Sequence, residues 1–116
     1  MAQTTVLTLL PQTPYNPTTN TVRGSKQPAA SYYLASSDLQ TVSWNINSFS
    51  GTLTIQVSLS TSPDEATDND WFTVHTVPYG STSGTFYTNI NGNFVWIRAK
   101  ISNFTQGVIQ YIRVSY

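Results

Sequence analysis

One stretch decides the fold class of this chain: Gly51-Thr-Leu-Thr-Ile-Gln-Val-Ser-Leu-Ser60. Its apolar side chains, which alternate with threonine, glutamine and serine, are Leu53, Ile55, Val57 and Leu59. Because successive side chains of a strand point to opposite faces, this alternation predicts a strand with one face in a core and the other in water. Strands of this one-sided kind are typical of antiparallel sheets.

The same alternation, filled with β-branched and aromatic residues, recurs along the chain. Residues 39–46 form one further predicted strand, with Val42, Trp44 and Ile46 on a common face. The remaining predicted strands are 6–10, 31–36, 71–77, 85–90, 93–102 and 108–116. Turns are expected at 47–51, 79–84 and 103–107, and at Asn91-Gly92, a strong hairpin signal. About eight short strands with frequent turns predict an all-β fold, an antiparallel β-sandwich of jelly-roll type.

Residues 11–28 contain four prolines, separated mainly by threonine, asparagine and glycine. Proline cannot donate a backbone hydrogen bond, so this segment cannot be a central strand and is predicted to be an extended arm or a long loop on a surface. The expected organisation is a single domain, with an N-terminal strand and arm over 1–30 and the β-sandwich over 31–116. We expect deletion of 11–28 to leave the sandwich folded and to weaken assembly.

Charged residues make up 9% of the 116-residue chain, and five basic side chains balance five acidic ones. Without a basic field the chain is not expected to bind nucleic acid. No apolar run approaches the roughly 20 residues of a membrane span, and no signal peptide is recognised, so synthesis in the cytoplasm is expected. The chain has no cysteine, which rules out disulfides and thiolate metal sites. A surface with so little charge repels neighbours weakly and tolerates packing into an assembly.

Residues suited to catalysis are sparse. His75 is the only histidine, and no Gly-x-Ser-x-Gly nucleophile motif accompanies it, so no catalytic residue, cofactor or enzymatic activity is expected. Four of the five acidic residues fall in one loop: Asp64, Glu65, Asp68 and Asp70. The default interpretation is a solvated acidic loop, and the alternative is a calcium site made from their carboxylate oxygens.

Aromatic residues break the one-sided pattern in the strand predicted over 93–102. The apolar face is Val95, Ile97, Ala99 and Ile101. The opposite face carries Phe94 and Trp96 before Arg98 and Lys100. Four explanations remain open for the two aromatic residues: cover by the proline-rich arm, cover by a neighbouring subunit, a sugar ring stacked on Trp96, or a central strand buried on both faces.

Four stretches of the C-terminal half carry a resemblance to a known family. They are 51–60, Asp70-Trp71-Phe72, Gly92-Asn-Phe-Val-Trp-Ile-Arg-Ala-Lys100 and Gly107-Val-Ile-Gln-Tyr-Ile-Arg-Val-Ser-Tyr116. Together they resemble small β-sandwich virion proteins of tailed phages, those of cyanophages in particular, over residues 31–116. The resemblance implies a protein that decorates capsids or forms part of a neck, tail or fibre, and it supplies no catalytic motif.

The expected function is therefore that of a virion structural protein, specifically a capsid decoration or cement protein. It would bind the major capsid protein or other virion proteins, and copies of itself, without contacting nucleic acid or membrane. The residues expected at these contacts are Tyr15, Arg23, Tyr32, Tyr33, Phe94 and Trp96. One alternative is a tail, neck or fibre component. Another is a carbohydrate-binding module that exposes Trp44, Trp71 or Trp96 to a glycan.

Overall fold

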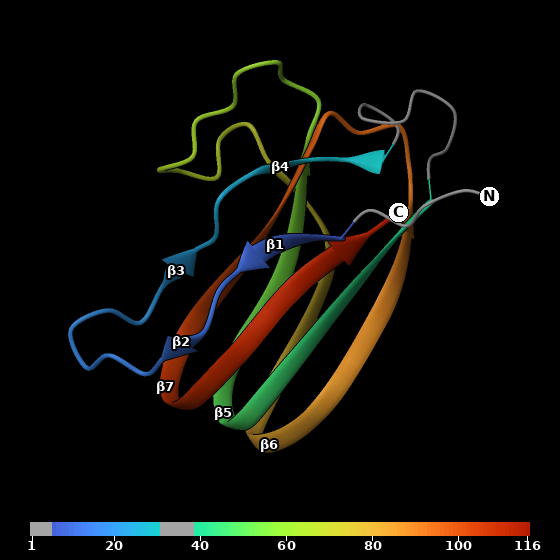
Figure 1. Cartoon of the computed structure of the whole chain (residues 1–116). Coiled ribbons are helices and arrows are strands. Elements are labelled where there is room, and N and C mark those ends of the chain that lie inside the picture. The colour runs from blue at the N-terminus through green and yellow to red at the C-terminus, as the bar shows by residue number, and fades with distance from the viewer. Residues whose placement is uncertain (1–5, 31–38) are drawn as a thin grey trace.

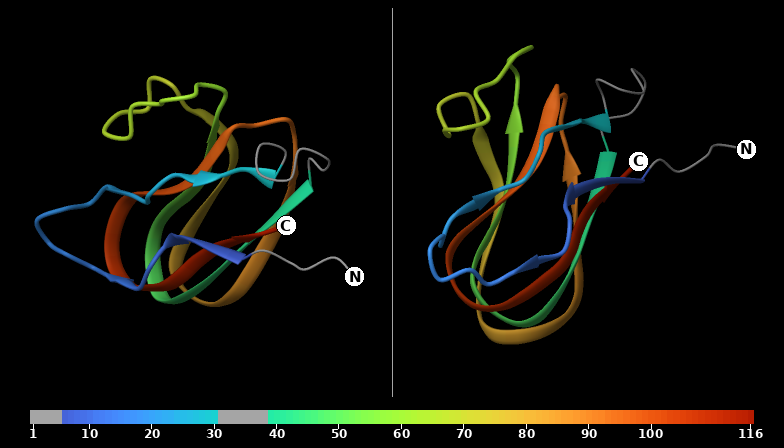
Figure 2. Two further views of the ribbon diagram at one scale, coloured as in Figure 1. Left: turned by 45° about the horizontal axis from the view of Figure 1, so that its top comes forward. Right: turned by 60° about the vertical axis from the view of Figure 1, so that its left-hand side comes forward.

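Three long strands dominate the computed structural model, which describes residues 6–30 and 39–116. They are β5 (Leu39–Ser58), β6 (Phe72–Asn91) and β7 (Trp96–Ser115). β5 lies between the other two and pairs antiparallel with both. Each strand bends once, so its two halves face each other across a core and the sheet has a U-shaped profile (Figures 1 and 2). The strand expected at 31–36 lies outside the described residues.

The bends coincide with the segments predicted as turns at 47–51, 79–84 and 103–107. The strands continue through them, because all three bend at the same level and the pairing resumes beyond the irregular residues. Ser48, Ser81 and Asn103 take up positive φ angles of 52°, 49° and 53° there. Gly107 has a φ of 91°, and a Cβ on it would lie 2.3 Å from the Ser48 carbonyl oxygen, so this position requires glycine. Six predicted short strands are thus three bent ones.

The N-terminal segment completes both layers of the sandwich. Its four short strands, which all pair antiparallel with β7, are β1 (Val6–Leu10), β2 (Thr13–Pro14), β3 (Val22–Arg23) and β4 (Gln27–Pro28). β1 and β2 lie along the second half of β7, and β3 and β4 lie along its first half. Each layer therefore has the order arm, β7, β5, β6. This arrangement confirms the antiparallel β-sandwich and is the double-sheet jelly roll.

The proline-rich arm forms the edge of the sheet next to β7, within the same chain. Pro14 and Pro28 even lie within β2 and β4, opposite Val108 and Trp96, because at an edge a missing backbone donor is tolerated. The Gly24 N–H donates to the Ala99 carbonyl over 2.8 Å, and Ala29 and Ala30 are fully buried. Deleting 11–28 would remove β2, β3 and β4 and uncover the first half of β7 and part of its second half, so the structure gives no reason to expect the sandwich to fold without this segment.

The core contains the faces that alternation singled out. Val42, Trp44 and Ile46 are buried in the first half of β5, and Leu53, Ile55 and Val57 in the second half. The prediction fails for Leu59, which is 58% exposed because β5 ends at Ser58. It also fails for the opposite face, expected to be wet, where Gln56 and Ser58 are buried. Across the described residues, no helix is long and apolar enough to cross a membrane.

The core assignment predicts cavity mutations with a built-in control. Ile55→Ala and Val57→Ala should each lower the free energy of unfolding by about 1–4 kcal/mol, because both side chains are fully buried. Leu59→Ala, which removes a similar side chain from the exposed end of the same alternation, should change it by less than about 0.5 kcal/mol. Urea unfolding followed by tryptophan fluorescence measures all three. Equal effects at 55 and 59 would contradict the assignment.

Candidate functional site

The acidic loop between β5 and β6 is bound to the sandwich through Asp68. Its carboxylate contacts Arg23 at 3.2 Å, Arg98 at 3.0 Å and Lys100 at 2.5 Å. The hydrogen bond from Lys100 lowers the pKa of Asp68 most, burial partly opposes it, and Arg23 lowers it further, from an ordinary 3.8 to about 2. Asp68 is therefore held ionised among three cations.

Arg98 explains why the outer face of β5 is buried. Its side chain is fully buried, and its Nε donates to Gln56 Oε1 over 2.9 Å. Its two terminal nitrogens donate to the backbone carbonyls of Glu65 and Thr67, and the guanidinium lies 4.1 Å from the centroid of the Trp71 ring. Burial lowers the pKa of Arg98, and the charge of Asp68 opposes that change. The loop thus folds over the outer face and is fixed there by a satisfied guanidinium.

The remaining acids of the loop do not converge on a cation site. Asp64 accepts hydrogen bonds from the Ala66 N–H and the Thr67 hydroxyl, within its own loop. Glu65 accepts from the backbone N–H of Lys26, and Asp70 accepts from that of Asp64. In the part of the chain that the structure describes, no group of three potential metal ligands comes together. The default expectation was a solvated loop. The structure shows instead that several of its residues are bonded to the sandwich.

Phe94, just before β7, and Trp96, its first residue, are partly covered by the chain itself. The Trp96 indole N–H donates to the Thr61 carbonyl over 3.3 Å, and the Lys26 ammonium lies 4.6 Å from the ring centroid. Phe94 is half-buried and packs against the core. Of the explanations left open, the arm accounts for Trp96, with help from the acidic loop.

The tryptophans therefore do not form the open glycan platform considered above. Trp44 is 2% exposed and Trp71 is 7% exposed, and both donate their indole N–H groups inside the protein, to the Tyr79 hydroxyl and the Asp64 carbonyl. Trp96 is engaged by the arm and the loop. An exposed aromatic face for a ligand must come from another residue.

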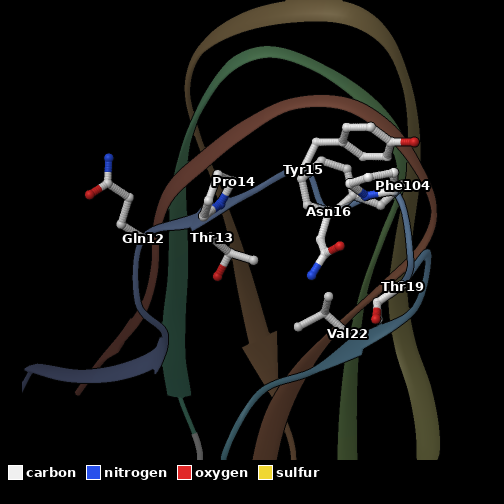
Figure 3. Close-up of a pocket in the computed structure, with 9 residues that line it drawn as sticks. Gln12, Thr13, Pro14, Tyr15, Asn16, Thr19, Val22 and Phe104 are labelled. Atoms are coloured by element: carbon white, nitrogen blue, oxygen red, sulfur yellow. The ribbon is translucent and has the colours of Figure 1, made fainter.

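Tyr15 supplies such a face, in a pocket of about 440 Å³ between the arm and the bend of β7 (Figure 3). Tyr15 is 42% exposed, and its ring centroid lies 5.9 Å from that of Phe104. We call this the arm pocket. Its lining residues are Gln12, Thr13, Pro14, Tyr15, Asn16, Pro17, Thr19, Val22 and Phe104.

Backbone hydrogen bonds hold the arm pocket in shape. The Tyr15 N–H donates to the Gly107 carbonyl over 2.9 Å, and the Phe104 N–H donates to the Asn20 carbonyl over 3.0 Å. Asn16 closes the turn between them, because its Oδ1 accepts hydrogen bonds from both the backbone N–H and the hydroxyl of Thr18. The signal for this turn was the Asn-Pro pair at 16–17, which favours turn initiation. Phe104, which packs against Tyr15 in the pocket, is remote in sequence, and no local motif indicated its place there.

The residues predicted to make contacts do not form one surface. Tyr15 lines the arm pocket, whereas Arg23 does not and forms an ion pair with Asp68 of the acidic loop. Phe94 and Trp96 are partly covered. Tyr32 and Tyr33 lie outside the described residues.

The outer edge of β6 is a surface that the sequence analysis missed. Among the described strands β6 pairs with β5 alone, so its other edge is unpaired over a 20-residue strand. The strand contains no aspartate, glutamate, lysine or arginine. Phe72, Val74 and Tyr87 are exposed on it by 55%, 37% and 70%. The signal for this surface in the sequence is the complete lack of aspartate, glutamate, lysine and arginine between Asp70 and Arg98.

Comparisons with known proteins show which solved structures have a similar fold. No protein-family model matches the sequence, and no curated protein matches it. The chain shares its fold with a phage-derived protein. That protein is the SPBc2 prophage-derived protein YomS, with a TM-score of 0.61 and 11% identity over 97% of this chain and 91% of YomS. A family 29 carbohydrate-binding module from Piromyces equi is also similar, with a TM-score of 0.55 and 12% identity over 98% of this chain and 91% of the module.

The lowered pKa of Asp68 predicts how stability depends on pH. Because the folded pKa lies below the ordinary value, the stabilisation is complete above about pH 4 and is lost as pH falls towards about 2. The difference in free energy of unfolding between the parent and Asp68→Asn should therefore be largest near pH 6 and shrink between pH 4 and pH 2. Urea unfolding at several pH values measures it. A difference that does not change with pH would show that the cations do not hold Asp68 ionised.

Proposed function

We propose that this protein is a structural component of a tailed-phage particle, specifically a capsid decoration or cement protein without enzymatic activity. It would bind the major capsid protein or another virion protein and associate with its own copies. The fold it shares with a prophage-derived protein, over nearly the whole of both chains, supports this proposal. So does the low charge of the sequence, because a weakly charged surface packs into an assembly with little repulsion.

The observation that carries the proposal is the uncharged outer edge of β6. Unpaired edge strands are ready templates for another strand, and proteins that remain monomeric usually blunt them with charges, prolines or short length. β6 is 20 residues long, has one proline at Pro78 and no charged residue. Exposed Phe72 and Val74 add apolar area beside backbone groups that none of the described strands pairs with. Pairing of this edge with a strand of a neighbouring subunit would satisfy the backbone and bury both side chains.

A tail, neck or fibre component of the same particle is the second candidate. The β6 edge suits either location, because strand pairing does not depend on where in the particle the neighbour lies. The head is preferred because fibres usually trimerise through repeats or coiled coils, and this sequence contains neither.

Labelling of intact particles tests the location. Antibodies raised against the folded chain should bind the heads of purified particles of the encoding phage, as seen by immunogold electron microscopy. Labelling of necks, tails or fibres would favour the second candidate. Absence of the chain from the proteins of the purified particle would overturn the proposal as a whole.

A charge placed on β6 tests the contact surface. Val74→Lys should reduce, by at least tenfold, the number of copies that bind to particles prepared without this protein, because a lysine blunts the edge. Leu59→Lys is the matched control, since it places the same charge on an exposed apolar residue outside β6. Both variants should melt at the parent's temperature. Equal loss in both variants, or no loss in Val74→Lys, would exclude β6 as the contact.

A further inference from the structure

We infer that the arm pocket binds a neutral saccharide. This inference goes beyond the structural role and does not rest on it, because the pocket lies at the bend of β7 and the contact proposed above lies on β6. A glycan was expected from the sequence to stack on a tryptophan, and the cover of the three tryptophans removes that basis. The arm pocket offers another basis, which is the chemistry, rigidity and accessibility of its nine lining residues.

The lining of the pocket suits a ligand with no charge and two kinds of face. None of its nine residues is an acid or a base with a charged form at neutral pH. A phosphate, sulfate or carboxylate would therefore lose its hydration without gaining a countercharge. A purely apolar ligand would bury amide and hydroxyl groups without partners. A pyranose ring has a C–H face for the Tyr15 ring and hydroxyl groups for the polar side chains, so it matches both parts of the lining.

The polar groups that would meet such a ligand are already positioned. Asn16 uses its Oδ1 to hold the turn through Thr18, which leaves its Nδ2 as a donor that makes no hydrogen bond within the described residues. Figure 3 shows the Asn16 amide in the middle of the labelled residues, between Thr13 and Thr19. An amide whose orientation is fixed by the protein loses little freedom when it binds a hydroxyl group, which favours affinity.

The apolar platform is also fixed. Tyr15 is anchored by its backbone N–H to Gly107, and its ring is tilted by 56° against Phe104, which is 1% exposed. The volume of about 440 Å³ lies within the range of small-molecule sites, roughly 300–1,000 Å³. The pocket is thus large enough for a short oligosaccharide and is formed before the ligand arrives.

A glycan array with the full-length chain is the first test, with neutral, sialylated and sulfated glycans displayed side by side. Neutral glycans should bind and charged ones should not. The neutral oligosaccharide with the strongest signal is then titrated by calorimetry. Tyr15→Ala should weaken its affinity at least tenfold by removing the platform. Asn16→Asp should do the same, since it retains the acceptor that holds the turn and removes the Nδ2 donor.

Tyr87→Ala is the matched control, because Tyr87 is another exposed tyrosine but lies on β6, away from the pocket. It should bind as the parent does. If Asn16→Asp lowers the melting temperature, Thr19→Val replaces it as the test. Valine has nearly the same shape as threonine but lacks the hydroxyl group, so this variant should also weaken the affinity for the oligosaccharide. Binding of no glycan, binding of charged glycans alone, or equal affinities of Tyr15→Ala and Tyr87→Ala would overturn the inference. None of these outcomes affects the particle labelling, so the two proposals fail independently.

Discussion

The packing of aromatic rings at the shared bend of β5, β6 and β7 is the interaction on which the rest of the structure depends. Phe49 contacts Phe104 edge-on at 5.2 Å and Tyr79 at 6.0 Å between ring centroids, so one ring from each strand meets at the fold line. Three long strands can bend together only if this space is filled and their ladders resume beyond it. The bend then makes two layers from one sheet, and it places Phe104 beneath Tyr15.

The sandwich closes its other surfaces by different means. The arm covers the edge of β7 with interrupted pairing, and Arg98 draws the acidic loop over the outer face of β5 and β7. The residues involved are prolines, carboxylates and a tryptophan stacked on a guanidinium. Such residues can indicate a binding site in a sequence, but here they cover the protein's own surfaces. Within residues 6–30 and 39–116, the surfaces proposed for partners are the edge of β6 and the arm pocket. A protein contact and a ligand site therefore occupy separate parts of the same rigid domain.

Prediction of the candidate sites from the sequence succeeded only in part. Tyr15 was singled out as a contact residue for partner proteins, which stays a prediction, and the structure places it in the arm pocket. Its neighbour there, Phe104, is 89 residues away along the chain, and no local pattern joins the two. Asp68 was grouped with acids near it in sequence, whereas its partners come from β3 and β7. The tryptophans looked available because a strand pattern does not show which loop will cover a face.

The sequence by itself determined the all-β class, the alternating core face of β5 and the places where the chain changes direction. These depend on local chemistry: the period of side chains along a strand and the backbone freedom of glycine, asparagine and serine. Only the tertiary structure decided that three of those changes are bends within continuous strands, that the proline-rich arm pairs with its own β7, and which faces remain open. Those outcomes depend on contacts between segments far apart in sequence, which no local pattern encodes.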